Sequence, residues 1–175
     1  MADTAIIGAP VPRDPQSVDR FAPYYTEHYA RVVAYARRRT GDLGAAEAVA
    51  ATVFAQAWRK TRLDPPPSGW LFLTARRVLD ERGAADVTLA GLWLAEAAAT
   101  APDGPPPELP ADLAATFAAV DALPPADREL VVALGWDGLT TAECATLLVT
   151  SPVTVRARLT ALKRSLGRHA GRRAS

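Results

Sequence analysis

The stretch from Leu139 to Leu166 constrains the fold more than any other part of the chain, because it predicts two helices joined by a short turn. Thr140 and Glu143 have the spacing of a capping box, in which each side chain satisfies a free backbone N–H of the other at a helix start. The Val149–Pro152 segment then interrupts the helical pattern, and its serine and proline suit the N-cap and first position of a second helix. This layout predicts a helix-turn-helix, whose second helix reads the major groove of DNA.

The second helix of this motif has one apolar and one basic face. Its apolar positions are Val155, Leu159, Leu162 and Leu166, and its basic positions are Arg156, Arg158, Lys163 and Arg164. From Thr150 onward the chain holds seven Lys/Arg and no Asp/Glu, whereas the preceding 149 residues hold 13 Lys/Arg against 19 Asp/Glu. A helical hairpin with a solvated basic face is the alternative, but this asymmetry favours a surface for nucleic acid.

Length and composition exclude several classes of protein. The chain of 175 residues has no apolar run near the ~20 residues of a membrane span, and its start does not resemble a secretory signal, so we expect a cytoplasmic protein without membrane insertion. The single cysteine, Cys144, excludes an internal disulfide and a cysteine-based metal site, and we expect it to be a small buried hydrophobe. No Gly-rich phosphate loop, catalytic triad or metal-ligand spacing is present, so we expect no enzyme, no cofactor and no metal.

Three helices are predicted in the N-terminal half, after a proline-rich segment, residues 1–15, that we expect to be disordered. They cover about 16–39, 43–61 and 70–83, with Asp42 and Ser68 as N-caps of the second and third. Arg37, Arg38 and Arg39 fall in the last turn of the first helix, where cations suit the helix dipole. Apolar residues at helical spacing give the three helices one core, which makes residues 16–83 the first predicted domain.

The rest of the chain predicts a linker and a second domain. Residues 84–111 are Ala-rich and then Pro-rich; a short helix can form at 89–98, and Trp93 would then need a packing partner. Residues 112–168 predict two further helices followed by the helix-turn-helix, and 169–175 form a basic tail. The predicted fold class is therefore all-α, with two small helical domains joined by an Ala/Pro-rich linker.

Motifs in both predicted domains resemble an extracytoplasmic-function sigma factor of the sigma-70 family. Those resembling region 2 are Phe21–Tyr29, Ala46–Glu47, Phe54–Arg59 and Trp70–Arg76. Those resembling region 4 are Leu123–Leu130, Gly138–Glu143 and Thr154–Leu159. The order of the motifs and the linker between them also fit this family.

This resemblance implies a sigma factor that binds core RNA polymerase and directs sequence-specific promoter recognition and transcription initiation. Region 2 would dock on the clamp helices of the polymerase and hold unstacked bases of the minus-ten element. Region 4 would read the minus-thirty-five element in the major groove and sit on the polymerase flap. The implied partners are core RNA polymerase, promoter DNA and an anti-sigma factor.

The resemblance and the chemistry of the side chains together indicate three sets of candidate site residues. For polymerase these are Glu47, Gln56 and Arg59, and for the minus-ten element Ser68, Trp70, Arg76 and Arg77. For the minus-thirty-five element they are Thr140, Thr141, Ser151, Thr154, Arg156, Arg158, Lys163 and Arg164. Arg156 and Arg158 suit guanine edges or phosphates, whereas Lys163 and Arg164 suit phosphates. An ion pair within the helix or with another helix is the alternative role for Arg76.

Four positions depart from the usual pattern of the family. Ala48 and Thr52 stand where acidic residues usually face the polymerase, Arg77 where an Asn usually faces melted DNA, and Val149 where the turn usually has Gly. A β-branched residue at positive φ would be strained by ~1–3 kcal/mol, so we expect a turn of different shape, which would re-aim the second helix. These departures support an alternative function, a sigma-like DNA-binding transcriptional regulator that no longer supports initiation by itself.

Overall fold

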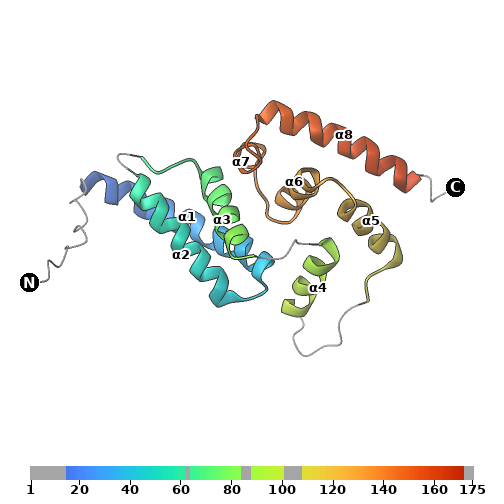
Figure 1. The fold of residues 1–175 in the computed structure, drawn as a ribbon, viewed down its shortest axis with the longest axis horizontal. Helices are drawn as coiled ribbons and strands as arrows, with labels where there is room; N and C mark the ends of the chain where they lie inside the picture. The colour runs from blue at the N-terminus through green and yellow to red at the C-terminus, as the bar shows by residue number, and fades with distance from the viewer. Residues whose placement is uncertain (1–14, 62–63, 84–87, 101–107, 172–175) are drawn as a thin grey trace, which may run out of the picture.

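The structure is a computed structural model that describes residues 15–61, 64–83, 88–100 and 108–171 (Figure 1). The regular structure of these residues is helical throughout, which confirms the predicted all-α fold class. The helices are α1 (Pro15–Thr40), α2 (Leu43–Lys60), α3 (Ser68–Glu81), α4 (Leu89–Thr100), α5 (Ala111–Asp121), α6 (Pro125–Gly135), α7 (Thr141–Leu147) and α8 (Pro152–Gly171). None of the helices in these residues combines the length and apolar character of a membrane span.

Helices α1 to α3 pack together as one half of the molecule, and aromatic side chains fill the space between α1 and α2. The ring of Phe21 lies 4.9 Å from that of Trp58, and the ring of Tyr25 lies 4.8 Å from that of Phe54. Asp42 caps α2 as predicted, because its side chain accepts a hydrogen bond of 2.6 Å from the backbone N–H of Ala45. This half therefore forms from the apolar positions that the sequence pattern indicates.

The predicted cap of α3 is wrong. Pro67 occupies the N-cap position with φ −54° and ψ 144°, and its side chain makes no capping hydrogen bond. Ser68 is instead the first helical residue, and its hydroxyl hydrogen-bonds the carboxylate of Glu143 in α7. The proline before Ser68 shifts the helix start by one residue and releases this hydroxyl for a distant partner.

Helices α5 to α8 form the other half, and α7 and α8 form the predicted helix-turn-helix. The capping box at the start of α7 is confirmed, because the Thr140 hydroxyl accepts from the Glu143 N–H at 3.2 Å and the Glu143 carboxylate accepts from the Thr140 N–H at 2.8 Å. Val149 in the turn has φ 51°, so the expectation of a differently shaped turn is wrong. The tight connection imposes this backbone on Val149, whose β-branched side chain is exposed but strained by the positive φ.

Helix α4 lies in the segment predicted as a linker, and it packs against α5. Leu89 and Leu92 are buried in a cluster with Phe117, Val120 and Val132. Trp93, whose partner the sequence could not identify, packs on this cluster. Figure 1 accordingly shows α4 between the two halves and beside α5.

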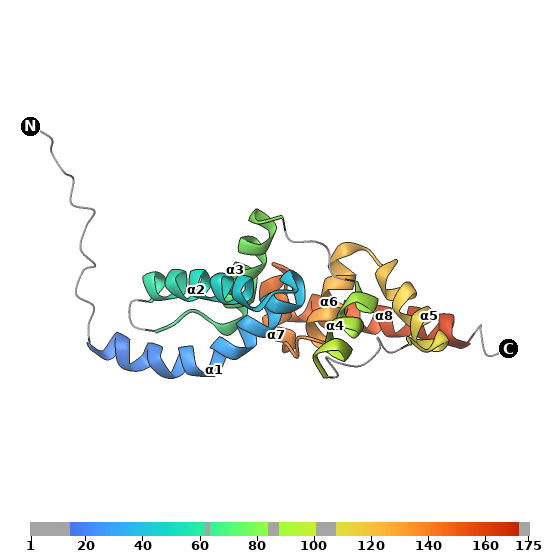
Figure 2. The ribbon, with the colours of Figure 1, turned by 90° about the horizontal axis from the view of Figure 1, so that it is seen from below.

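One continuous hydrophobic cluster crosses from the first half to the second. It joins Tyr35 and Phe72, from α1 and α3, to Leu130 and Leu147, from α6 and α7. Helix α7 packs more extensively against α3 than against α8, and the two lie side by side in Figures 1 and 2. The first helix of the DNA-reading motif is thus also the element that joins the two halves.

Candidate nucleic-acid interface

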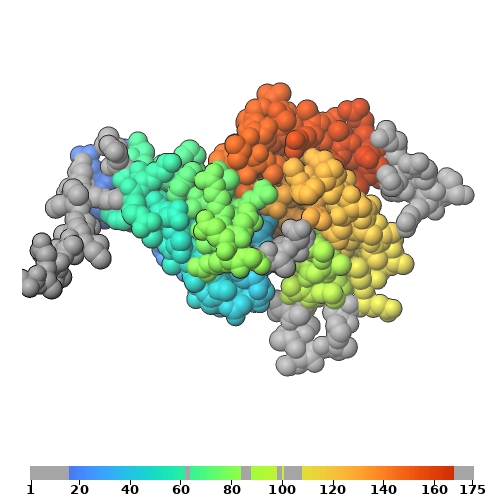
Figure 3. Space-filling view, in the orientation of Figure 1, coloured from blue at the N-terminus to red at the C-terminus, as the bar shows by residue number. Residues whose placement is uncertain are grey.

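The outer face of α8 exposes most of the residues predicted to bind the minus-thirty-five element. Its start is capped by Ser151, whose hydroxyl accepts from the Thr154 N–H at 3.1 Å and lies 2.9 Å from the Thr154 hydroxyl. The apolar side is held in the core, because Val155 is fully buried and Leu162 nearly so. The exposed side carries Arg156, Arg158, Lys163 and Arg164. Figure 3 shows α8 running along one edge of the molecule with its outer side open.

Among the basic residues of α8 whose side chains the structure describes, Arg158 and Arg164 make only weak contacts within the chain. Arg158 Nη1 lies 3.8 Å from Asp127 Oδ1, and Arg164 Nε donates to the carbonyl of Thr160 at 3.3 Å, one turn earlier. Such exposed contacts contribute under ~1 kcal/mol, so these side chains are available to a ligand. The row of cations on a capped helix has the arrangement needed to approach the phosphates and base edges of a duplex.

The other two residues predicted to bind the minus-thirty-five element lie at the start of α7, and they are less available to a ligand than those of α8. Thr140 is exposed, but its backbone and hydroxyl are both engaged by Glu143, at 2.8 and 3.0 Å. Thr141 is half-buried. The start of α7 is therefore directed toward its own cap and the first half of the molecule.

The residues predicted for the minus-ten element are spread along α3. Trp70 is half-buried, with Lys60 Nζ 5.2 Å from the centre of its ring. Arg77 is exposed, whereas Arg76 lies 3.9 Å from Asp80, four residues along the helix, which is the alternative role considered for it. Ser68 lies under α7 through its contact with Glu143. The structure therefore leaves the end of α3 open and covers its start.

The three residues predicted to contact polymerase lie on α2 but do not share one face. Glu47 and Arg59 are exposed, and Gln56 is half-buried. Glu47 and Gln56 point to opposite sides of the helix, because nine residues make about two and a half turns. Ala48 and Thr52, where the family usually has acidic residues, are joined by a hydrogen bond from the Thr52 hydroxyl to the Ala48 carbonyl at 2.9 Å.

The sequence did not reveal a set of ion pairs between α1 and the second half of the molecule. Arg39 lies 3.2 Å from Glu129 and 3.0 Å from Asp137, and Arg38 lies 3.2 Å from Asp137. The side chains of Arg39 and Asp137 are 7% and 1% exposed, so this contact is buried. The helix dipole is therefore an incomplete explanation of the arginine run at the end of α1, since two of the three arginines bind carboxylates of α6 and of the turn before α7.

A second ion pair connects α1 to α7. Arg31 donates to Glu143 through Nη1 and Nη2 of its guanidinium, at 2.9 and 3.0 Å, and the Glu143 side chain is only 5% exposed. Burial by itself would raise the pKa of this carboxyl, but hydrogen bonds from Arg31, Thr140 and Ser68 lower it to about 2. Glu143 is therefore held ionised at the place where α1, α3 and α7 meet.

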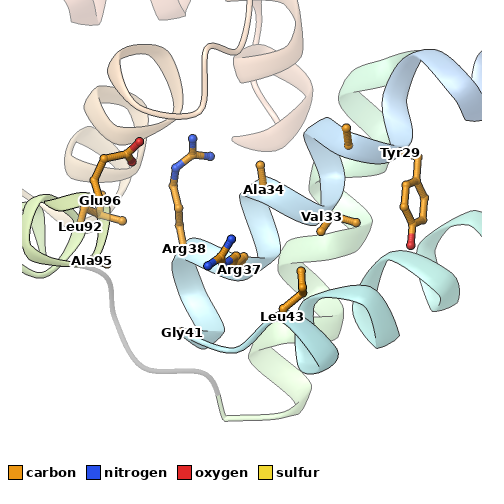
Figure 4. A pocket seen from close by; sticks show the side chains of 11 residues that line it. Tyr29, Val33, Ala34, Arg37, Arg38, Gly41, Leu43, Leu92, Ala95 and Glu96 are labelled. Carbon is orange, nitrogen blue, oxygen red and sulfur yellow. The ribbon is translucent and has the colours of Figure 1, made fainter. Parts of the chain in front are cut away.

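A groove of about 470 Å³ separates the end of α1 from α4 (Figure 4). Tyr29, Val33 and Leu43 line one side of it, and Leu92 and Glu96 of α4 line the other. The described residues contain no group of three or more His, Cys, Asp or Glu side chains placed to hold a metal ion, in this groove or elsewhere.

Comparisons with known proteins match both halves to models of one family. Residues 24–82 match the family model described as Sigma-70 region 2, and residues 114–166 match that described as Sigma-70, region 4. Among curated proteins nothing matches the chain. Among solved structures, the chain is similar to the sigma factor RpoE of Bartonella quintana in complex with the anti-sigma factor NepR, with 18% identity, a TM-score of 0.45, and coverage of 83% of this chain and 93% of that chain.

Proposed function

Because this chain belongs to the sigma-70 family, with region 2 followed by region 4, we propose that it binds core RNA polymerase and directs it to specific promoters. The observation that carries this proposal is the exposed basic face of α8, on a helix-turn-helix that lies within region 4. Arg156 and Arg158 reach base edges or phosphates of the minus-thirty-five element, and Lys163 and Arg164 bind its phosphates.

In this proposal region 2 holds the melted minus-ten element on α3. Bases taken out of the stack bind aromatic and Arg surfaces, and α3 offers Trp70 and Arg77 for this purpose. Glu47, Gln56 and Arg59 of α2 contact the polymerase clamp, with Gln56 and Arg59 on one side of the helix and Glu47 on the other. An anti-sigma factor and a cytoplasmic location belong to the same proposal and rest on the family alone.

A second candidate function is a sigma-like regulator that binds DNA but does not support initiation by itself. The observation that favours it is the surface of α2, where Ala48 and Thr52 stand in place of acidic residues and leave Glu47 as the only carboxylate on this helix. Loss of carboxylates would weaken a contact with a basic polymerase surface without affecting region 4.

One binding experiment separates these two functions. Purified chain is mixed with bacterial core RNA polymerase and analysed by size-exclusion co-elution at moderate salt, which suppresses non-specific contacts of the basic C-terminal segment. A sigma factor is expected to bind the polymerase tightly and one-to-one. Glu47→Ala should weaken this binding more than Arg156→Ala does. Failure to co-elute, with duplex DNA still bound by the chain alone, would contradict the initiation function and favour the regulator.

A further inference from the structure

The carboxylate of Glu143 fills a small anion-binding site on the first half of the molecule. We call this the Arg31 site, formed by the guanidinium of Arg31 on α1 and the hydroxyl of Ser68 at the start of α3. Arg31 binds Glu143 through two nearly parallel hydrogen bonds, at 2.9 and 3.0 Å. This planar fork suits a phosphate as well as a carboxylate, because both present two oxygens at a similar spacing.

The surroundings of the Arg31 site suit a nucleic-acid strand. Arg31 lies over the ring of Phe72 at 5.2 Å, which holds the guanidinium in place, and its side chain is still 34% exposed. Two residues beyond Ser68, Trp70 presents a ring beside the ammonium of Lys60, at 5.2 Å. A cation next to an aromatic surface is the usual combination for binding single-stranded DNA, since the backbone meets the charge and a base meets the ring.

The charges of the segment that covers this site differ from those of its surroundings. Residues 108–150 contain seven Asp/Glu and one Lys/Arg, whereas residues 15–83 contain eleven Lys/Arg and seven Asp/Glu. Glu129, Asp137 and Glu143 of this acidic segment all pair with arginines of α1. The second half thus presents to α1 the kind of anionic surface that a phosphate backbone would present.

We propose that the Arg31 site binds a backbone phosphate of single-stranded DNA, and that Glu143 occupies it in the closed arrangement of the two halves. This inference rests on the proposed function, since it places the phosphate beside the strand held by α3. The proposed function assigns a separate promoter element to each half, whereas the closed arrangement keeps the two halves in direct contact. Separation of the halves removes Glu143 and opens the site to DNA.

Gly69 provides a way to open the site without changing its charges. A Cβ atom at Gly69 would lie 2.8 Å from Thr146 Cβ and 3.0 Å from Glu143 Cα, both in α7. These atoms cannot rotate away, so Gly69→Ala pushes α7 from α3. The backbone of Gly69 is helical, and alanine is therefore compatible with α3 itself. Gly167 of α8 is a matched control, because a Cβ there would meet nothing within 4 Å.

The test measures binding of a fluorescently labelled single-stranded oligonucleotide of mixed sequence to the full-length chain by anisotropy, over a series of salt concentrations. Gly69→Ala and Glu143→Gln are each expected to bind about ten-fold more tightly than the unchanged chain, the usual value of a charge-assisted hydrogen-bonded contact. The salt slope should steepen by about 0.7 for the one phosphate gained. Gly167→Ala should bind like the unchanged chain.

Arg31→Ala separates a phosphate site from a purely structural ion pair. Glu143→Gln and Arg31→Ala break the same pair, but only the first leaves the arginine for DNA. We therefore expect Arg31→Ala to gain no affinity and to abolish the gain of Gly69→Ala, whereas Arg37→Ala, an exposed arginine on the same helix, should preserve most of it. Circular dichroism identifies any variant that does not fold. If Glu143→Gln does not fold, the comparison of Gly69→Ala with the double variant Gly69→Ala/Arg31→Ala decides whether Arg31 binds the oligonucleotide.

Three results of the oligonucleotide assay would overturn the proposal. The first is an equal gain in affinity in Glu143→Gln and Arg31→Ala. The second is an equal loss of affinity from Arg31→Ala and Arg37→Ala in the Gly69→Ala chain, and the third is no gain in either Gly69→Ala or Glu143→Gln. Loss of polymerase co-elution in Arg31→Ala without any change in oligonucleotide binding would also overturn it and assign the site to an acidic protein surface. Because the oligonucleotide assay contains no polymerase, its outcome is distinguishable from failure of the proposed initiation function.

Discussion

Helices α7 and α8 belong to one DNA-reading motif, yet their surfaces have opposite uses. Glu143, Cys144, Ala145 and Leu147 are all buried in the seven-residue α7, which packs against α3. Helix α8 buries only one side and leaves Arg156, Arg158, Lys163 and Arg164 in solvent. The comparison shows that the two helices of this helix-turn-helix have separate roles. The first helix holds the two halves of the molecule together, and the second is open to a ligand.

This division predicts that substitutions in α7 change stability and closure, whereas those on the outer face of α8 change binding alone.

Leu147→Ala should lower the free energy of unfolding by about 3 kcal/mol, because a fully buried leucine loses its contacts and leaves a cavity. Val153→Ala on α8 is the matched control, since Val153 is 66% exposed, and it should change stability by under ~0.5 kcal/mol. Urea unfolding followed by circular dichroism measures both. Similar losses of stability in the two variants would contradict the separate roles of α7 and α8.

Glu143→Gln should lower stability by about 2 kcal/mol at neutral pH, because the ionised carboxylate is buried and accepts charge-assisted hydrogen bonds. The pKa of Glu143 is lowered from 4.5 to about 2, so folding favours the ionised form. Its contribution is therefore fully present above pH 4.5 and lost as the pH falls from about 4.5 to about 2.

The gap in unfolding free energy between Glu143→Gln and the unchanged chain should accordingly close over this range of pH. Urea titrations of both chains at several pH values measure the gap, and the other titrating groups cancel in the difference. A gap that stays constant down to pH 2 would show that Arg31 and Ser68 do not hold this carboxylate ionised.

Arg156→Ala should weaken binding of the polymerase complex to its promoter by about 1.5 kcal/mol, or roughly ten-fold, and relax the base preference at one position. Lys163→Ala should weaken binding equally for all sequences and reduce the salt slope by about one. Selection from a randomised duplex and anisotropy at several salt concentrations distinguish the two. Unfolding of both variants should match that of the unchanged chain.

Val149→Gly should raise the free energy of unfolding by about 0.5 to 1 kcal/mol, because Val149 has φ 51° and its side chain is 77% exposed. The same change at Val153, inside α8, should lower stability by about 1 kcal/mol, since glycine disfavours a helix interior. Thermal unfolding measures the opposite signs. Destabilisation at both positions would mean that the turn between α7 and α8 is unstrained.

The elements that the sequence predicted well depend on neighbouring residues. The capping box of Thr140 and Glu143, the caps at Asp42 and Ser151, and the burial of Cys144 are all confirmed. Each depends on contacts within a few positions, which a residue pattern contains directly. The basic face of α8 was predictable for the same reason, since helical spacing alone separates it from Val155 and Leu162.

The elements that the sequence missed depend on distant partners. Ser68 was assigned to a cap and instead binds Glu143, and the turn at Val149 kept a positive φ despite its β-branched residue. Helix α4 lies in the segment assigned to a linker, where a short helix was expected to need a partner for Trp93, and only the structure shows that this partner is the cluster with Phe117 and Val132. The run of arginines at the end of α1 indicated a charged contact, but the neighbouring residues did not identify the carboxylates that pair with them.

The sequence by itself determined the positions of most helices, which of their faces are apolar and that α8 is cationic, because these follow from backbone hydrogen bonding and helical periodicity. Only the tertiary structure decided that Arg31 meets Glu143, 112 residues away, and that α7 covers the start of α3. A charge pair across two halves depends on how their surfaces fit, and any of several arginines could have paired with any of several carboxylates. The close approach of α7 to Gly69 selects among them, since a larger residue there would hold the two surfaces apart.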